Sequence, residues 1–273
     1  MVLATRLETI FGPHVINHGA KLHHEAGSGT RLVGMSRWLN AEQRSRADQL
    51  VSIFENGTPL IQYDYAENLD DGRGVTVGRA GFTTATGDAL DVIEILVDCP
   101  ADLVVFIPEL QRLRRTQSAQ TGGLPEAAFV RAWKAAAHLE RFRDAQDRIV
   151  DREYYEPAMR AADALGLAMP LARVQLYDAA IQHGVGDDPD SLGSLIVRAG
   201  RRRSAASGEG AWLDAFFDVR IETLQAPSNT ATTSAWRDST DRVECMRRLA
   251  RSSHGSLDSP FACEVFDATF SIT

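Results

Sequence analysis

The chain has 273 residues, of which 44% are hydrophobic and 24% charged, and its formal net charge is −8. This length and composition exclude wholesale disorder and a fibrous repeat, and they favour one large domain or two lobes. The negative charge disfavours a nucleic-acid partner, because such proteins usually carry a basic face, and no apolar stretch is long enough to span a membrane.

The cysteines are too few and too scattered for a disulfide framework or a metal finger: Cys99, Cys245 and Cys263. A single bridge between Cys245 and Cys263 stays open. The first residues lack the apolar core and the small-residue cleavage site of a secretory signal, so either the protein stays in the cytoplasm or the sequence begins after a removed signal.

Residues 1–35 have the weakest pattern, and we expect an exposed arm or extension. His14, His18, His23 and His24 fall in this glycine-rich stretch. A histidine cluster suggests a metal, but no helical ligand spacing such as HExxH is present, so no metal site is predicted.

The first clear element is a helix over residues 40–54. Asn40 with Gln43 forms a capping-box pattern, and apolar residues recur at helical spacing up to Phe54. Gly57 and the nearby Pro59 predict the stop, which places Glu55 at the helix C-terminus. The helix dipole and apolar surroundings would hold a proton on this carboxyl group more tightly than water does, which suits a general acid.

A small antiparallel sheet is predicted next, from strands at 61–65 and 75–77 around a tight turn at 68–74. A further helix is expected over about 86–96. The rest of the chain has helical patterns, which are predicted at about 101–115, 125–140, 145–166, 169–183, 190–204, 210–225 and 236–252. The predicted fold class is therefore α+β and mainly helical, with the apolar helix at 169–183 at its centre.

Two carboxyl groups with different settings can act as an acid and a base pair. Glu55 ends a helix, and Asp71 lies in a glycine-rich turn 16 residues later. Because the chain has 37 acidic residues, this spacing alone favours the alternative that both are ordinary cap and turn residues.

Four neighbouring segments together resemble the signature region of the family 46 chitosanases: Phe54 to Asn56, Gln62 to Asn68, Asp71 to Thr76 and Gly81 to Asp88. The resemblance continues in four later segments: Asp151 to Pro157, Tyr177 to Pro189, Phe217 to Arg220, and Arg242 with Val243. It covers about residues 36–270. The sequence departs from the family pattern at Asp70, Val75, Val77 and Val185, which leaves the preference for particular sugars open.

The resemblance implies a two-lobed, lysozyme-like fold with a substrate cleft between the lobes, formed by residues 36–273 as one catalytic domain. It also implies an endo-acting glycoside hydrolase that cuts the β-1,4 bonds of chitosan with inversion. Glu55 matches the general acid, Asp71 the general base, and Thr76 the residue that helps to hold the attacking water.

Substrate-binding positions are implied in the same way. Asp88 matches a position that binds the sugar amine, although a helix N-cap is the alternative. Tyr65, Glu67 and Arg73 match cleft-wall residues. His183 matches a substrate-side histidine, although a histidine at a helix end is more often structural.

Asp178, Arg220 and Arg242 match a salt-bridge network behind the general acid. We expect it to fix the position of the acid and to allow its reprotonation between turnovers. A purely structural ion network is an equally good interpretation.

The expected partner is chitosan or a chito-oligosaccharide, whose amines suit an acidic protein, with no cofactor, no nucleic acid and no membrane. We expect a secreted monomer, because polymeric chitosan is an extracellular substrate. The alternatives are a related lysozyme-like hydrolase of peptidoglycan or chitin, and an inactive carbohydrate-binding homologue.

Overall fold

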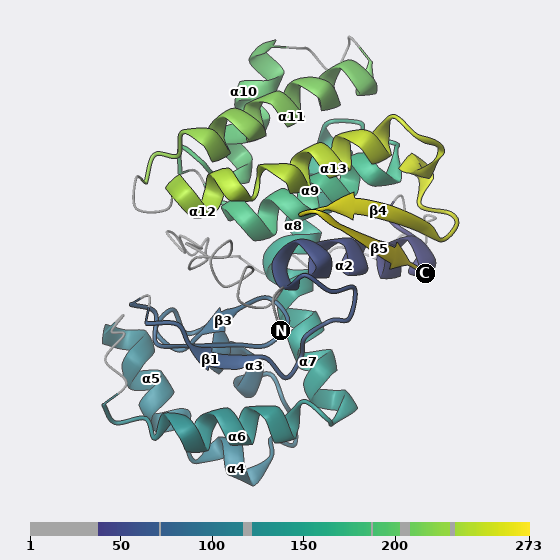
Figure 1. The fold of residues 1–273 in the computed structure, drawn as a ribbon. Coiled ribbons are helices and arrows are strands. Elements are labelled where there is room, and N and C mark those ends of the chain that lie inside the picture. The colour runs from purple at the N-terminus through teal and green to yellow at the C-terminus, as the bar shows by residue number, and fades with distance from the viewer. Residues whose placement is uncertain (1–37, 71, 117–121, 187, 203–207, 230–232) are drawn as a thin grey trace, which may run out of the picture. The chain divides into compact units, whose positions relative to one another are not determined.

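The computed structural model describes residues 38–70, 72–116, 122–186, 188–202, 208–229 and 233–273 (Figure 1). They form two compact units, one from the chain up to Pro59 together with Tyr154–Thr273, and the other from Leu60–Glu153. The predicted arm at residues 1–35 and the proposed base Asp71 lie outside the described residues.

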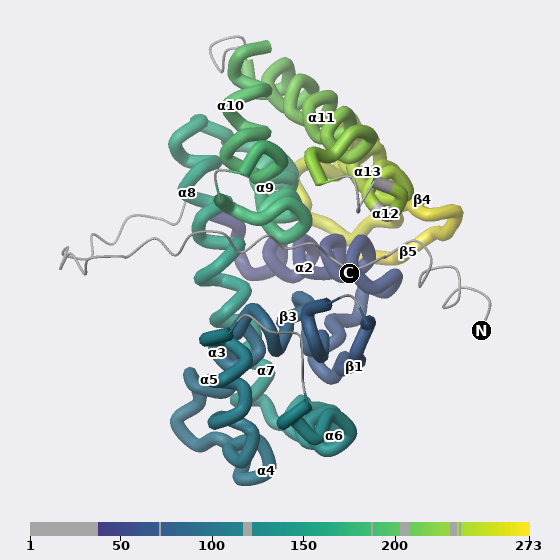
Figure 2. The backbone as a smooth tube through the Cα atoms, turned by 90° about the vertical axis from the view of Figure 1, so that its left-hand side faces the viewer, coloured from purple at the N-terminus to yellow at the C-terminus, as the bar shows by residue number. Residues whose placement is uncertain are grey.

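The central element of the first unit is α9 (Pro170–His183), as predicted. Every residue of α9 after Pro170 is buried, so this helix is covered on all sides. It packs against α2 (Ala41–Asn56), α8 (Glu156–Ala164), α10 (Leu192–Arg202) and α13 (Thr240–Ala250). Figure 2 shows α8, α9 and α10 side by side.

Helix α2 has the predicted cap at Asn40 and the predicted stop at Gly57, and its last residue lies two positions beyond the predicted end at residue 54. The Asn40 side chain accepts a hydrogen bond from Gln43 N, and the Gln43 side chain accepts one from Asn40 N, which completes the capping box. Gly57 adopts a left-handed conformation with φ of 66°, and its N–H donates to Ile53 O. Glu55 is therefore fixed in the last turn of a well-terminated helix.

The remaining part of the first unit contains a hairpin that the sequence analysis missed. After α11 (Glu209–Gln225), the predicted helix at 236–252 is instead two helices, α12 (Thr233–Asp238) and α13. A 3-10 turn, η4 (Ser253–Ser256), leads into antiparallel β4 (Phe261–Val265) and β5 (Ala268–Ile272). Their turn residues Phe266 and Asp267 both have positive φ, which matches the twist of a two-residue hairpin.

The second unit is built on a three-stranded antiparallel sheet with the order β1 (Ala66–Asn68), β2 (Val75–Val77), β3 (Phe82–Thr83). The strand predicted at 61–65 is wrong, because the strand begins only at Ala66. Tyr63 O instead accepts hydrogen bonds from Trp133 Nε1 (3.1 Å) and Gln146 Nε2 (3.0 Å). Side chains from distant helices thus satisfy the backbone that a strand would have paired.

Five helices accompany this sheet: α3 (Asp88–Glu94), α4 (Ala101–Val104), α5 (Ile107–Thr116), α6 (Glu126–Ala136) and α7 (Glu140–Val150). The predicted helix at 145–166 is α7 and α8 joined by a π-helix, η1 (Asp151–Tyr155), which contains the second boundary between the units. Trp133 lies in edge contact with Phe142, with ring centroids 4.8 Å apart, at the core of this unit.

The predicted fold class, mainly helical with a small antiparallel sheet, is confirmed. All three cysteines are free thiols, and Cys245 and Cys263 are both buried. None of the helices in the described ranges is both long and apolar enough to cross a membrane.

Candidate active site

Glu55 projects from the last turn of α2 into a buried ionic cluster of the first unit. Its side chain is only 8% exposed, and Arg242 Nη2 donates a hydrogen bond of 2.7 Å to Oε1. Because α2 ends at the left-handed Gly57, this carboxyl group is held on a rigid helix end and not on a loop.

The cluster extends from Arg242 on α13 to Asp178 on α9 and Arg220 on α11. The same Arg242 Nη2 lies 2.5 Å from Asp178 Oδ1. Arg220 Nη1 lies 2.6 Å from the other oxygen, Oδ2, as an ion pair without the angle of a hydrogen bond. The structure therefore brings together all four residues that the resemblance placed in one network.

The charges of this cluster are balanced against strong burial. Burial lowers the pKa of Arg220 to about 10, although Asp178 acts in the opposite direction. Burial also acts to lower the pKa of Arg242, but Asp178 and Glu55 together outweigh it and raise that pKa. Both guanidinium groups are thus cationic at neutral pH, and between them they contact the carboxyl groups of Asp178 and Glu55.

His183 lies at the end of α9 inside the same cluster. Its Nε2 accepts a hydrogen bond from Arg220 Nε (3.2 Å), and its ring packs edge-on against Trp236 with centroids 5.0 Å apart. Burial, and then the charges of Arg220 and Arg242, lower its pKa well below the usual value. The imidazole is therefore neutral. It is only 5% exposed, and it serves as a buried hydrogen-bond acceptor beside the ion network.

Two supporting contacts have no signal in the sequence. Gln182 Oε1 accepts from Arg220 Nη2 (2.5 Å), while Gln182 Nε2 donates to Ser239 Oγ (2.8 Å) at the N-terminus of α13. Farther along α2, Tyr177 OH donates to Asp48 Oδ1 (2.9 Å) and so ties α2 to α9. These bonds connect the three helices that carry Glu55, Asp178 and Arg242. No local sequence motif predicts the bonds.

In the second unit, Thr76 occupies the middle of β2, opposite Glu67 on β1 and Thr83 on β3. Thr76 is 3% exposed, and its Oγ1 has no hydrogen-bond partner among the described residues. Buried hydroxyl groups are normally satisfied, so this one is suited to hold a water molecule.

The predicted wall residues flank this strand. Tyr65 OH donates to Glu67 Oε2 (3.2 Å), with Glu67 exposed and Tyr65 half-buried. Arg73 is half-buried, and its carbonyl accepts from Ala85 N (3.1 Å) beside the start of β2. Tyr65 and Glu67 therefore form one polar pair at the edge of the sheet.

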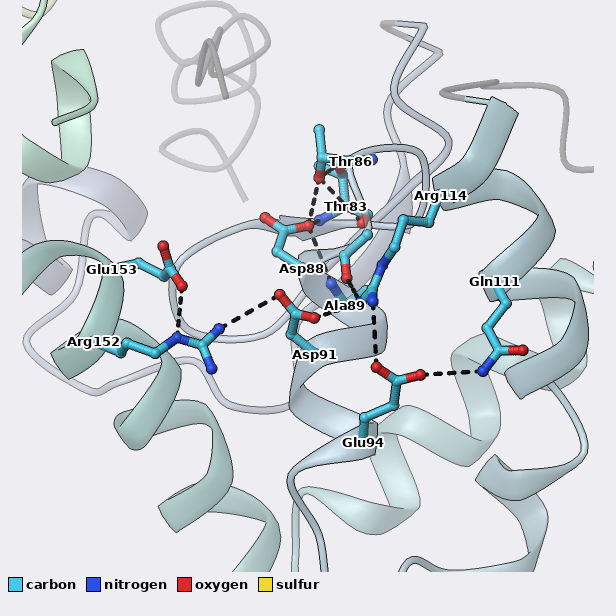
Figure 3. Close-up of polar contacts among 11 residues, drawn as sticks. Thr83, Thr86, Asp88, Ala89, Asp91, Glu94, Gln111, Arg114, Arg152 and Glu153 are labelled. Carbon is cyan, nitrogen blue, oxygen red and sulfur yellow. Dashed lines mark hydrogen bonds and ion pairs between the residues drawn. The ribbon is translucent and has the colours of Figure 1, made fainter. Parts of the chain in front are cut away.

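Asp88 is the first residue of α3, and the N-cap that the alternative interpretation gave it belongs to Gly87. Asp88 Oδ1 accepts from Thr83 N (2.7 Å), Thr86 Oγ1 (2.5 Å) and Ala89 N (3.1 Å), as Figure 3 shows. These bonds link the helix start to β3 and fix the orientation of the carboxylate.

No group of three or more histidine, cysteine, aspartate or glutamate side chains in the described part of the chain is arranged to hold a metal ion. The clusters at Glu55 and at Asp88 instead pair carboxylates with guanidinium groups or with uncharged donors.

Comparisons with known proteins identify the family. The profile described as glycosyl hydrolase family 46 matches residues 49–261. The chain belongs to this family. A chitosanase of Bacillus subtilis (strain 168) is 47% identical over 228 residues, which cover 81% of this chain and 82% of that protein. A chitosanase of Streptomyces sp. (strain N174) is 35% identical, over 74% of this chain and 72% of that protein.

Solved structures agree with the sequence relatives. The native chitosanase of Bacillus subtilis MY002 matches with a TM-score of 0.78 and 46% identity, covering 86% of this chain and all of that one. A family 46 chitosanase of Gynuella sunshinyii, in complex with chitotetraose, matches with a TM-score of 0.77 and 42% identity, covering 86% and 99%. These likenesses confirm the lysozyme-like fold and the glycoside hydrolase class that the resemblance implied.

Proposed function

We propose that this chain is an endo-acting, inverting chitosanase with Glu55 as its general acid and Asp71 as its general base. The observation that carries the proposal is the Glu55 carboxyl group, nearly buried at the end of α2 and bonded to Arg242 in a family 46 chain.

In the proposed reaction, Glu55 donates its proton to the glycosidic oxygen as the bond breaks. The carboxylate that results is stabilised by the hydrogen bond from Arg242, so the cluster favours proton transfer to the leaving group. Asp178 contacts the same nitrogen and limits how strongly Arg242 acts on Glu55 alone. That restraint allows Glu55 to take up a proton again before the next turnover.

Asp71 removes a proton from the water that attacks the anomeric carbon on the opposite face, which gives inversion. The Thr76 hydroxyl orients that water. The buried and unsatisfied Oγ1 of Thr76 supports this role, because it can bond a water that Asp71 also contacts.

The proposed substrate is chitosan or a chito-oligosaccharide, whose ammonium groups pair with Asp88. Tyr65, Glu67 and Arg73 bind further sugar units. A related chitosanase of Bacillus subtilis MY002 has been solved as a mutant complexed with six GlcN units, and this supports the substrate class. The net charge of −8 attracts such a cationic polymer.

For His183, the burial and the bond from Arg220 favour the structural alternative over contact with the sugar. We assign it to positioning of Arg220. The protein acts as a secreted monomer without a cofactor in this proposal, because a polymer substrate has to be met outside the cell.

Release of reducing ends from chitosan, colloidal chitin and peptidoglycan tests the proposal when wild-type protein and Glu55→Gln are compared. Wild type should release ends from chitosan, and Glu55→Gln should be slower by about a hundredfold or more, which is the usual range for a general acid. Full activity of Glu55→Gln would exclude it as the acid. Preference for chitin or peptidoglycan would indicate the related hydrolase, and no release from any polymer would indicate a binding protein.

A further inference from the structure

Arg114 on α5 reaches across to α3 and contacts its N-cap Gly87, Asp91 in its middle and its last residue, Glu94 (Figure 3). Its Nη2 donates to Gly87 O (2.6 Å) and to Asp91 Oδ1 (2.5 Å), and its Nη1 lies 3.3 Å from Glu94 Oε2. A planar guanidinium with several fixed donors can hold three acceptors at once, which an ammonium group cannot do with the same geometry.

The backbone of Gly87 is shaped to receive this side chain. Gly87 has a φ of +91°, and a Cβ atom there would lie 2.4 Å from Arg114 Nε and 2.7 Å from Arg114 Cγ. The stem of Arg114 therefore lies directly over the Cα of Gly87, in space that any other residue would fill. Gly87, the residue immediately before Asp88, is therefore packed tightly against the Arg114 side chain.

The position of this turn decides where the Asp88 carboxylate points. Its Oδ1 is fixed by donors from Thr83, Thr86 and Ala89, and all three are uncharged. The two arginines of the region, Arg114 and Arg152, pair instead with Asp91 (2.5 and 3.5 Å). In the cluster drawn in Figure 3, Arg114 thus pairs with Asp91 and Glu94, while Arg152 pairs with Asp91 and Glu153.

We propose that Arg114 is a positioning residue for amine recognition, which holds the first turn of α3 so that Asp88 meets a glucosamine ammonium group. This inference rests on the proposed role of Asp88 as the amine-binding residue. Arg114 does not contact the sugar in this scheme, and it neutralises Asp91 and Glu94 while it sets the geometry of their neighbour.

Removal of Arg114 has two opposite effects on binding. Loss of a positive charge near Asp88 would strengthen the attraction for an ammonium group, and added salt would screen that gain. Loss of the three contacts would let the turn move and weaken binding at any salt concentration. The proposal requires the second effect to be larger.

The experiment measures kcat and KM for fully deacetylated chitohexaose with wild type, Arg114→Gln, Arg114→Lys and Asp88→Asn. Arg114→Gln should raise KM about tenfold with kcat within about twofold, because it removes binding that is equal in the ground and transition states. The KM of Arg114→Lys should lie between the values of wild type and Arg114→Gln, since lysine keeps the positive charge but not the forked donor geometry of the guanidinium group. The matched control is Arg112→Gln on the same helix, whose partner is Glu109 and not α3, and its KM should stay at the wild-type value.

A second substrate separates positioning from general damage. With half-acetylated chitosan, where fewer amines are present, the increase in KM for Arg114→Gln should shrink. An equal loss on both substrates, or an unchanged KM for Arg114→Gln together with a raised KM for Asp88→Asn, would overturn this inference and leave the amine site standing. An unchanged KM for Asp88→Asn would overturn both proposals.

Discussion

Arg242 contacts Glu55 and Asp178 through one and the same nitrogen, Nη2, at 2.7 and 2.5 Å. The position of the proposed acid therefore depends on Asp178, which holds Arg242 in place. Asp178 is fully buried, and its other oxygen pairs with Arg220. A change behind Glu55 is expected to alter both the stability of the fold and the rate of the reaction.

Arg242→Gln tests that dependence. We expect kcat to fall about 10- to 100-fold, because Glu55 is no longer held in one geometry. The free energy of unfolding should fall by about 3–5 kcal/mol, because Asp178 stays buried after losing a charged partner. The measurements are initial rates on chitosan and urea unfolding. Arg248→Gln is the control on the same helix, with a side chain that is 55% exposed, and it should change neither quantity appreciably. A wild-type kcat for Arg242→Gln would contradict the account.

Thr76→Val should separate activity from stability. Removal of a buried hydroxyl without a described partner should leave the free energy of unfolding unchanged or raise it by about 1 kcal/mol. We expect kcat to fall at least about tenfold, since the attacking water loses its orienting group. Thr76→Ser should keep most of the activity.

Thr84→Val is the matched control for that experiment. Thr84 is also fully buried, but its Oγ1 accepts a hydrogen bond from Val75 N (3.1 Å). Its loss should cost about 1–3 kcal/mol of stability by leaving that N–H unsatisfied, with little effect on kcat. If Thr76→Val destabilised the protein as much as Thr84→Val, the Thr76 hydroxyl would have a structural partner.

The lowered pKa of His183 predicts a pH dependence of stability. Between that lowered value and about 6.5, only the unfolded chain binds the proton, so stability should decrease as the pH falls below neutrality. Melting temperatures from pH 7.5 to 5.5 should therefore fall more steeply for wild type than for His183→Gln, whose amide oxygen can still accept from Arg220. His138→Gln, at an exposed position, should keep the wild-type slope. Identical slopes for wild type and His183→Gln would show that His183 protonates in the folded state.

Gly78→Ala should be strongly destabilising, because Gly78 combines a φ of +71° with a lack of space. A Cβ atom there would lie 2.4 Å from Gln146 Oε1 and 2.9 Å from Phe82 Cδ2. We expect a loss of about 3 kcal/mol or more from overpacking and backbone strain together.

Gly166→Ala isolates the backbone part of that loss. Gly166 has a φ of +69° but nothing within 4 Å of the added Cβ, so the cost should be about 1–2 kcal/mol. Thermal unfolding of the two variants gives the comparison, and equal losses would refute the packing explanation.

Local signals predicted much of the fold. The capping-box pattern at Asn40 and the stop at Gly57 predicted the bounds of α2 to within two residues, and the apolar pattern at 169–183 predicted the central helix α9. The strand expected at 61–65 failed because Trp133 and Gln146 bind the Tyr63 carbonyl from more than 60 residues away. Such long-range bonds leave no pattern in the segment they hold.

The β4–β5 hairpin, which was not predicted, does have a local signal in the sequence. Phe261, Cys263 and Val265 alternate with exposed residues, as a strand with one buried face requires. For the site, the four residues that the resemblance related, Glu55, Asp178, Arg220 and Arg242, lie in one ion network. Gln182 and Arg114 were not predicted, because their contacts are to residues far away in the sequence and leave no pattern in the neighbouring sequence.

The configuration of the first product tests the central claim most directly. Proton NMR of the anomeric signals, recorded within the first minutes of chitosan hydrolysis, should show the α anomer before mutarotation, as expected for one water activated by Asp71 and one proton from Glu55. An initial β product would mean retention, and it would contradict the scheme of one acid, one base and one water.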